Sequence, residues 1–429
     1  MHISTDNLFS VAAASLLAVF GVAHAQPPSP NPVAWRQLEQ QFQDMVKTQE
    51  RAGIAWIVAQ HGRQLSSGAI GWQDQERRIP VDELTTFRLY SMTRAITTVA
   101  ALRLMDKGKL NLDQPLAHYL PKFAAPKVVT KSLKTDEIQL VPAKREITVR
   151  DLMTYQAGFG YAYDYPTSLG LKREEILGLN LSTAQGIDRL AEFPLLHHPG
   201  ERWHYGFASD VLGRVIELIT AQPLDQALQQ LVFDPLGMTS TGFFSSLDHL
   251  AKAYGPDPLT GRWIELTERL PKSADYIQAG SMHSGGGGLL SSASDYFVFC
   301  EMLRNRGVGP HGVFLKASTV DLMERNTMSP EQGPLFWHRA DASPVMTEGG
   351  WGLGIGVRQS SVNTPLLTSR QGELFWGGLA GTGFFIDREA GITAVVMTQY
   401  LGPDGDKPVL LLRQALYGSQ RAEETNLAP

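Results

Sequence analysis

The spacing of apolar residues predicts a helix and then two strands at the start of the chain. Between residues 34 and 51, Trp35, Leu38 and Phe42 fall three or four residues apart, as residues on one face of a helix do. The stretches 53–60 and 64–72 are predominantly apolar, and His61-Gly62 between them is suited to a turn. We therefore expect an amphipathic helix followed by a β-hairpin.

The strongest helical pattern runs from Ser91 to Lys107, and Gly108 follows it as a stop signal. Its apolar residues share one face: Met92, Ile96, Val99, Leu102 and Met105. This pattern places Ser91 near the start of the helix. Backbone N–H groups without a partner and the positive end of the helix dipole favour negative charge there.

The middle of the chain is predicted to be mostly helical, and the last third returns to strands. Helices are expected to begin near 147 and to cover about 184–192, 206–220, 224–232, 294–304 and 407–416. Strands are expected at 351–358, 373–387 and 391–399. The polar stretch 127–145 is interpreted as a surface excursion and 159–180 as a loop or lid. Strands at both ends, with helices between them, predict one sheet built from both ends of the chain.

The first residues are typical of a secretory signal. Leu8 to Phe20 is a short apolar run, and Ala23-His24-Ala25 is a small-x-small cleavage site. The run is too short to span a bilayer comfortably, although a short anchor or a disordered leader are alternatives. We expect export, to the periplasm or out of the cell.

These patterns divide the chain into five parts. We expect a signal peptide at 1–25, a Pro-rich linker at 26–33 and a flexible tail at 421–429. An α/β region is expected to combine 34–125 with 285–420, and a mostly helical region to occupy 126–284.

Composition excludes several classes of function. The chain has 429 residues, of which 43% are hydrophobic and 19% charged, and its net charge is −5. This composition predicts a soluble globular protein with a large core, and it supports neither nucleic-acid binding nor a basic membrane patch. Cys300 is the single cysteine, so no internal disulfide can form, and we expect its thiol to be buried.

Ser91-Met92-Thr93-Arg94 is close to a known catalytic pattern. Penicillin-recognising serine hydrolases have a serine nucleophile followed three residues later by a lysine. Here an arginine stands at that position, and a guanidinium in a protein does not lose its proton. Taken alone, the pattern also fits a solvated or helix-capping serine.

Several further segments, in the same order, resemble the serine β-lactamase-related family. That family includes class C β-lactamases, DD-peptidases and family VIII esterases. The segments that carry the resemblance are 87–97, 113–121, 147–154, 199–205, 209–213, 286–296 and 376–382. The resemblance extends from about residue 35 to about residue 415. It implies an α/β (α+β) fold of the β-lactamase/transpeptidase type, with an antiparallel sheet from both chain ends, flanking helices and an inserted helical region.

The resemblance also implies roles for individual residues. Ser91 corresponds to the acylated nucleophile, and Tyr205 to the tyrosine that moves protons onto and off the serine and the leaving group. The backbone N–H groups of Ser91 and Leu379 correspond to the oxyanion hole, in which each donor is commonly worth about 3 kcal/mol in the transition state.

Three departures from the family pattern bear on the substrate. Trp376-Gly377-Gly378 replaces a basic triplet that grips the carboxylate of β-lactams, and Phe207 replaces an asparagine. Tyr155 begins the segment that replaces a His-Thr-Ser-Gly sequence. We expect these residues to contact substrate. The changes at Trp376 and Phe207 point towards an uncharged ester or amide and away from efficient β-lactam hydrolysis.

Arg94 raises the question of where the Ser91 proton goes. Because Arg94 cannot accept it, we expect Tyr205 to be the general base and Arg94 to be its electrostatic support. The alternative is that Arg94 abolishes acylation, and that the protein binds acylated or peptide ligands without turnover.

The sequence therefore predicts an exported serine hydrolase that forms an acyl-enzyme on Ser91. The expected substrates are small esters, amides or short peptides, without metal or organic cofactor. Neither His197-His198 nor the glycine run 285–288 predicts a ligand site, because no carboxylate lies at ligand spacing and no P-loop lysine follows. We expect no nucleic-acid partner and no stable membrane insertion, and the sequence leaves the oligomeric state open.

Overall fold

The computed structural model describes residues 31–131, 137–169, 181–244, 248–267, 282–332, 335 and 343–418. The expected signal peptide, most of the linker, the expected tail and residues 170–180 of the expected lid lie outside these ranges. Within them, no helix is long and apolar enough to cross a membrane.

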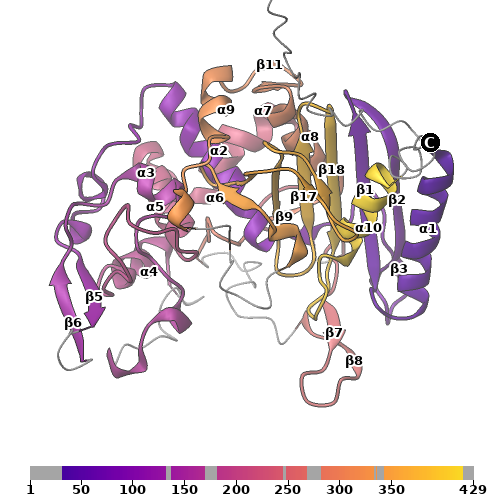
Figure 1. Ribbon diagram of the computed structural model, residues 1–429, viewed down its shortest axis with the longest axis horizontal. Coiled ribbons are helices and arrows are strands. Elements are labelled where there is room, and N and C mark those ends of the chain that lie inside the picture. Colours follow the sequence, from indigo (N-terminus) through magenta and orange to yellow (C-terminus); the bar gives the residue numbers. More distant parts are fainter. Residues whose placement is uncertain are drawn as a thin grey trace, which may run out of the picture.

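An eight-stranded antiparallel sheet joins the two ends of the chain (Figure 1). Its strands, in spatial order, are β12 (Gly349–Trp351), β13 (Gly356–Arg358), β16 (Leu374–Gly377), β17 (Gly383–Asp387), β18 (Ile392–Thr398), β1 (Gly53–Gln60), β2 (Arg63–Asp74) and β3 (Ile79–Pro80). The N-terminal β1 pairs with the C-terminal β18 from Ile54–Thr398 to Gln60–Ile392. This pairing confirms the predicted sheet built from both ends.

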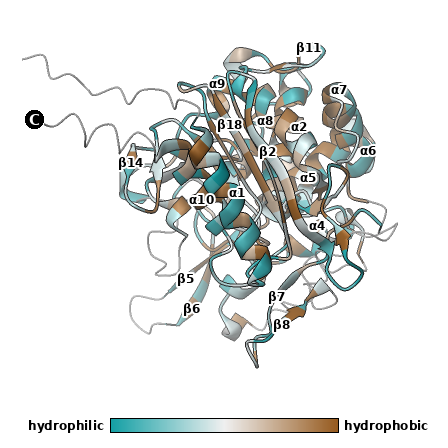
Figure 2. Cartoon of the chain, turned by 90° about the vertical axis from the view of Figure 1, so that its right-hand side faces the viewer, coloured by the Kyte–Doolittle hydropathy of each residue, from teal (hydrophilic) through white to brown (hydrophobic). Residues whose placement is uncertain are grey.

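Helices cover both faces of this sheet. On one face, Phe42 of α1 (Pro32–Lys47) packs edge-on against Trp56 of β1, with ring centroids 5.1 Å apart. On the other, Glu301 of α8 (Ala293–Arg304) accepts a hydrogen bond from Thr393 of β18. Trp56 pairs with Val396, three residues from Thr393, and side chains alternate along a strand, so the two contacts lie on opposite faces. Figure 2 shows the apolar strands beside the more polar α1.

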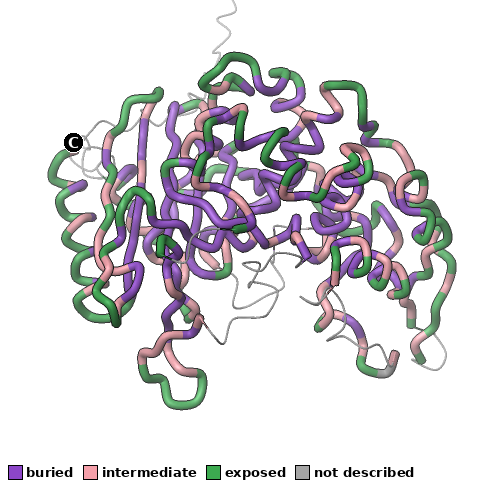
Figure 3. Tube along the Cα trace, turned by 180° about the vertical axis from the view of Figure 1, so that it is seen from behind, coloured by how far each residue is buried: buried purple, intermediate pink, exposed green. Residues whose placement is uncertain are grey.

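The closing helix α10 (Lys407–Tyr417) lies beside α1, as the two labels in Figure 1 show. Every residue of β17 and β18 is buried. Burial on both faces explains why these strands are mostly apolar and do not alternate regularly with polar residues. Figure 3 shows this buried layer through the middle of the molecule.

The helical part of the chain packs around α5 (Ala208–Thr220), and α2 (Thr93–Asp106) is one of the helices that contact it. This part also comprises α3 (Val149–Met153), α4 (Thr183–Leu190), α6 (Leu224–Leu228), a π-helical turn (Gln229–Phe233) and α7 (Asp234–Leu236). α9 (Ala317–Met323) lies further along the chain. The prediction that α2 has one apolar face is wrong, because Arg94, Thr97 and Thr98 are buried as well. α2 is a central helix, enclosed on all sides.

Two predicted strands are in fact hairpins. Residues 351–358 span the end of β12, a turn and β13, and residues 373–387 span β16, a turn and β17. Gly354 and Gly381 in these turns have φ of +69° and +80°, a conformation that glycine adopts at little cost. The polar excursion at 127–145 contains a surface hairpin of β5 (Lys127–Lys131) and β6 (Ile138–Pro142). A further hairpin, β7 (Tyr254–Pro256) with β8 (Trp263–Glu265), was not predicted.

Candidate active site

Ser91 lies in a short turn between the sheet and α2. The turn is a 3₁₀ helix, Tyr90–Met92, which follows the strand β4 (Phe87–Arg88). Tyr90 has φ of +46°, which is costly for a bulky residue and is found where the surrounding structure fixes the backbone. Ser91 is half-buried, and its hydroxyl makes no hydrogen bond within the described ranges. The hydroxyl is thus held on a constrained turn without a partner.

The turn between β16 and β17 lies directly against the turn that carries Ser91. A side chain at Gly378 would overlap the carbonyl oxygen of Leu89, and only glycine allows this approach. Leu379, the next residue, is 62% exposed. Among the described residues, the backbone N–H groups of Ser91 and Leu379 have no acceptor. The structure therefore brings together the two turns expected to form the oxyanion hole; the role itself remains a prediction.

Arg94 is buried one helical turn after Ser91 and donates to three tyrosine oxygens. Its Nε donates to Tyr205 Oη at 2.6 Å, Nη1 to Tyr155 Oη at 2.5 Å, and Nη2 to Tyr161 Oη. Nη1 also donates to the carbonyl of Gly206 at 3.2 Å. We call Arg94, Tyr155, Tyr161 and Tyr205 the arginine–tyrosine cluster.

Burial tends to lower the pKa of Arg94. The phenol oxygens of the cluster and the carboxyl of Asp210 offset this effect and hold the pKa well above its ordinary value. Arg94 is therefore a fixed cation, as its residue type requires, and it cannot receive the proton of Ser91.

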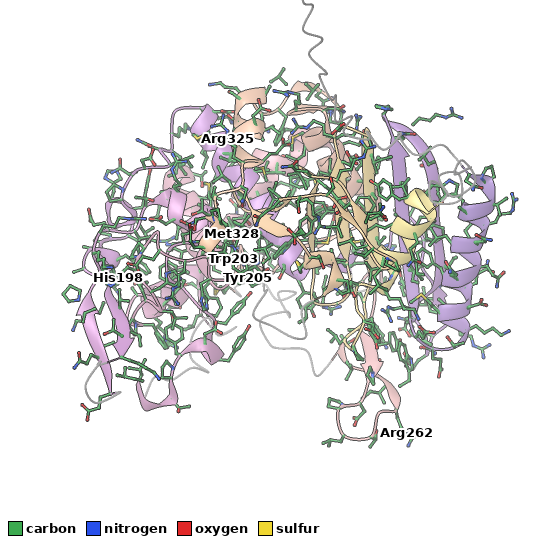
Figure 4. All side chains as sticks on the ribbon, viewed as in Figure 1. His198, Trp203, Tyr205, Arg262, Arg325 and Met328 are labelled. Carbon is green, nitrogen blue, oxygen red and sulfur yellow. The ribbon has the colours of Figure 1, made fainter. Side chains whose placement is uncertain are left out.

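Tyr205 receives two N–H donors at its hydroxyl. Besides Arg94 Nε, Trp376 Nε1 donates to Tyr205 Oη at 3.2 Å. The ring stacks on that of Tyr155, with centroids 5.3 Å apart, and lies 5.5 Å from that of Trp376. Figure 4 shows Tyr205 close to Trp203 near the centre of the molecule, and their rings stack at 5.8 Å. Two donors on one oxygen favour negative charge there, as a general base requires.

Two residues expected to contact substrate are buried supports of Tyr205. Tyr155 is 1% exposed. Its hydroxyl accepts a hydrogen bond from Arg94 Nη1 and lies 2.7 Å from Ser209 Oγ. Trp376 is 4% exposed and acts through its N–H on Tyr205. The sequence could not show that these two side chains are buried. The position of a segment along the chain does not tell whether its side chains point towards the substrate or into the protein. Phe207, Gly377 and Gly378 are partly exposed, and their contact with substrate stays a prediction.

Tyr161 and Asp210 were not predicted as site residues. Tyr161 lies in the expected lid, and its ring meets the edge of Phe207 at 5.0 Å. Asp210 is buried, and it accepts hydrogen bonds from the hydroxyl of Ser284 and from Gly286 N–H at 3.3 Å. Burial raises the pKa of Asp210, against the opposing charge of Arg94. The only sequence signal was that Asp210 follows Ser209 in a family-like segment.

The glycine run passes closely behind this cluster. A Cβ on Gly286 would lie 2.5 Å from Asp210 Oδ2 and 3.0 Å from Arg94 Nη1. The run therefore passes so close to Asp210 and Arg94 that a side chain at Gly286 would not fit. In the described part of the chain, no group of three His, Cys, Asp or Glu could hold a metal ion, and Cys300 is buried as predicted.

Comparisons with known proteins show the family and the fold of the chain. The Beta-lactamase family matches residues 36–419. Esterase EstB of Burkholderia gladioli is 31% identical over 408 residues, which cover 89% of this chain and 94% of that protein. Lovastatin esterase of Penicillium rubens is 31% identical over 343 residues, or 74% of this chain and 80% of that one.

Solved structures show the same fold. EstCE1, described as a hydrolase with promiscuous acyltransferase activity, is 28% identical, with a TM-score of 0.72 over 90% of this chain and 99% of that one. Simvastatin synthase (LovD) from Aspergillus terreus, 24% identical, superimposes with a TM-score of 0.76 over 91% of this chain and 99% of that one. The chain therefore belongs to the beta-lactamase family and is a serine hydrolase similar to its esterases and acyltransferases.

Proposed function

We propose that the protein hydrolyses uncharged esters, and amides less readily, through an acyl-enzyme on Ser91 with Tyr205 as general base. One observation carries the proposal: Tyr205 Oη accepts hydrogen bonds from both Arg94 and Trp376. These donors stabilise a phenolate, which can take a proton that Arg94 cannot take.

In the acylation step, Ser91 Oγ attacks the carbonyl carbon of the ester while its proton moves to the Tyr205 phenolate. The oxygen of the tetrahedral intermediate is held by the backbone N–H groups of Ser91 and Leu379. The intermediate collapses, the bond to the leaving alcohol breaks, and Tyr205 gives its proton to that alcohol. Water then attacks the acyl carbon while its proton moves to Tyr205. The bond from that carbon to Ser91 Oγ breaks, and Tyr205 returns the proton to Oγ, which releases the acid and restores Ser91 and the phenolate.

The surroundings of the site favour an ester over a β-lactam. Trp376 provides no positive charge for a carboxylate, and Phe207 and Tyr161 present aromatic rings. The relatives named as esterases, EstB and lovastatin esterase, support this choice. An alcohol in place of water would make the same acyl-enzyme an acyltransferase, as the description of EstCE1 suggests.

The test compares p-nitrophenyl acetate and butyrate with a chromogenic cephalosporin. We expect the wild type to hydrolyse both esters faster than the cephalosporin, and Ser91→Ala to be inactive. Tyr205→Phe should lose about 100-fold or more in kcat, the usual contribution of a general base. A fluorophosphonate should label Ser91, as mass spectrometry of the peptide would show. No adduct and no turnover, at any pH up to the range in which tyrosines ionise, would favour the binding protein instead.

We also propose that the protein is exported, on the strength of the apolar run 8–20 and the site at 23–25. Residues 1–25 lie outside the described ranges. Cell fractionation, with N-terminal sequencing of the mature chain, tests this proposal. A chain that starts at Met1 and stays in the cytoplasm would contradict it.

A further inference from the structure

The arginine–tyrosine cluster brings together residues from separate parts of the chain. Arg94 is on α2, Tyr155 follows α3, Tyr161 lies in the loop after it, and Tyr205 precedes α5. The guanidinium is planar and its N–H groups point in fixed directions. When some N–H groups are held, the direction of the others is fixed as well.

The contacts of Arg94 divide its guanidinium into two parts. Nη1 and Nη2 are held by Tyr155, Tyr161 and the carbonyl of Gly206. Nε–H is then directed at Tyr205, 2.6 Å away. Without the phenol oxygens of Tyr155 and Tyr161, Nη1 and Nη2 would keep one acceptor within the described ranges, the carbonyl of Gly206, and the guanidinium could rotate away from Tyr205.

The three phenols are not equivalent. Tyr155 is enclosed, and its hydroxyl also contacts Ser209. Burial is the chief cause that raises the pKa of Tyr155 and of Tyr161, against the charge of Arg94. Both therefore stay protonated. Tyr205 is distinguished by the second N–H donor, from Trp376. Among the three phenol oxygens, that of Tyr205 therefore receives two N–H donors, from Arg94 and from Trp376.

A second set of contacts fixes the position of Tyr161. Asp164 Oδ2 accepts a hydrogen bond from Tyr161 N–H at 2.6 Å and lies 3.3 Å from Nε2 of His204. His204 directly precedes Tyr205 and donates its own N–H to the carbonyl of Tyr155 at 2.8 Å. Through Asp164 and His204, the turn that carries Tyr161 therefore contacts the segment that carries Tyr205.

We propose that Tyr155 and Tyr161 are positioning residues for the reaction at Ser91, holding the Arg94 guanidinium with its Nε–H on Tyr205. The inference rests on the proposed function and assigns two residues that the function itself does not require. It explains how an arginine serves where the family pattern has a lysine: as a rigid donor whose direction two phenols set.

The charged and titratable groups around Arg94 and Tyr205 are the other two phenols and Asp210, with His204 next in the chain. Asp210 keeps its place through Ser284 and Gly286, neither of which contacts the phenols. Removing a phenol hydroxyl therefore leaves the Asp210 contacts in place. The substitutions Tyr155→Phe and Tyr161→Phe test the orientation of Arg94 with little change in net charge.

The experiment measures kcat, KM and the pH profile for p-nitrophenyl butyrate in Tyr155→Phe, Tyr161→Phe and the double variant. Tyr165→Phe is the matched control, because Tyr165 is a buried tyrosine of the same loop whose ring packs on Phe193, at 5.5 Å, and it is not one of the acceptors of Arg94. Thermal unfolding of each variant reports any loss of fold. Ultraviolet difference titration follows tyrosinate without turnover, and the signal that Tyr205→Phe removes is assigned to Tyr205.

We expect kcat of the double variant to fall about tenfold while KM changes less than about twofold. The pH of half-maximal activity, and the tyrosinate signal of Tyr205, should both move to higher pH, since a misdirected Arg94 supports the phenolate less. Tyr165→Phe should move neither. An unchanged profile, or a shift to lower pH that marks the two phenols as competitors for Arg94, would overturn the proposal. Failure of the wild type to label at Ser91 would reject only the hydrolase function, since the tyrosinate titration would still test the cluster.

Discussion

At the scale of the residue, Arg94 differs from lysine in shape as much as in basicity. One ammonium nitrogen carries three donors from a single point, whereas the guanidinium spreads five over a plane. The structure uses that spread, because the hydroxyls of Tyr155, Tyr161 and Tyr205 lie around its rim together with the carbonyl of Gly206. Replacement by lysine is therefore not conservative here, although lysine is the residue of the family pattern.

We predict that Arg94→Lys lowers kcat/KM for p-nitrophenyl butyrate at neutral pH by about tenfold or more, because one ammonium cannot reach all four oxygens. Arg103→Lys, on the same helix, is the control: its Nη1 donates to a single carbonyl, that of Leu231, at 2.8 Å. This control should retain the activity of the wild type. A rise in activity of Arg94→Lys would mean that arginine hinders the reaction and that a lysine base restores it.

His197 gives a prediction about stability and pH. It is buried, and burial lowers its pKa to about 4. The unfolded chain should titrate near pH 6.5, so it binds a proton at a pH where the folded chain does not. The contribution of neutral His197 to the free energy of unfolding is therefore fully present above its pKa in the unfolded chain. It is lost as the pH drops from about 6.5 towards 4.

We expect the free energy of unfolding of the wild type to fall by about 2 kcal/mol because of His197 when the pH is lowered from about 7.5 to about 5. His197→Gln should lose that part of the pH dependence, whatever its stability at neutral pH. Denaturant titrations of both proteins at the two pH values measure the difference. Equal pH dependence in the two proteins would show that His197 titrates in the folded state much as it does in the unfolded chain.

At the scale of the element, the glycine run 285–288 forms a turn that passes beside Asp210 and Arg94. A Cβ at Gly285 would lie 2.5 Å from the carbonyl of Ser209, and one at Gly286 would press on both Asp210 and Arg94. At Gly287 the nearest atom, in the backbone of Tyr90, would be 3.8 Å away. Neighbouring glycines therefore differ sharply in what they tolerate.

Gly286→Ala should reduce stability by about 1–3 kcal/mol, since it overpacks a closed site, and should lower kcat by displacing Arg94. Gly287→Ala should be close to the wild type in both respects, because its Cβ meets only ordinary contacts. Thermal unfolding and ester hydrolysis of the two variants, measured side by side, check this. Equal behaviour of the pair would contradict the close approach at Gly286.

Elements also show how far the sequence leads. Periodicity and turn residues located α1, β1, β2, α8 and α10, because each presents an uninterrupted local pattern. They did not separate β12 from β13, since Trp351 to Arg358 is as apolar through the turn as in the strands. The family-like segments, which occur in the family's order, predicted Ser91, Arg94 and Tyr205 as residues of the candidate site. The contact of Arg94 with Tyr161, 67 residues away, depends on the path of a loop, and local sequence does not encode that path.

At the scale of the whole molecule, a buried ion cluster ties the sheet to the last helix. Arg413 of α10 makes a bidentate pair with Glu373, at 2.8 and 2.7 Å, and Arg358 of β13 reaches the same carboxylate at 3.3 Å. All three side chains are almost completely buried. Such a cluster adds little net stability while it is intact, but removing the shared anion leaves two guanidiniums uncompensated.

Glu373→Gln should therefore destabilise the fold by about 3–5 kcal/mol. Glu389→Gln is the matched control, because Glu389 is exposed and its pair with Arg370, at 3.6 Å, is worth at most about 1 kcal/mol. Denaturant unfolding monitored by tryptophan fluorescence gives both values. A loss for Glu373→Gln no greater than that of the control would mean that the buried arginines find other partners.

The pairing of β1 with β18 has a consequence for how the chain comes into being. β1 is made near the start of synthesis and must wait for a partner some 340 residues later, since Ile54 pairs with Thr398. Until then the edge of β1 that pairs with β18 is uncovered, and long-range pairing of this kind is slow and prone to aggregation. The turn that bears Ser91 rests between this sheet and α2. The active site is therefore among the last features to form, and a polypeptide interrupted before β18 would carry the nucleophile without the scaffold that gives it chemistry.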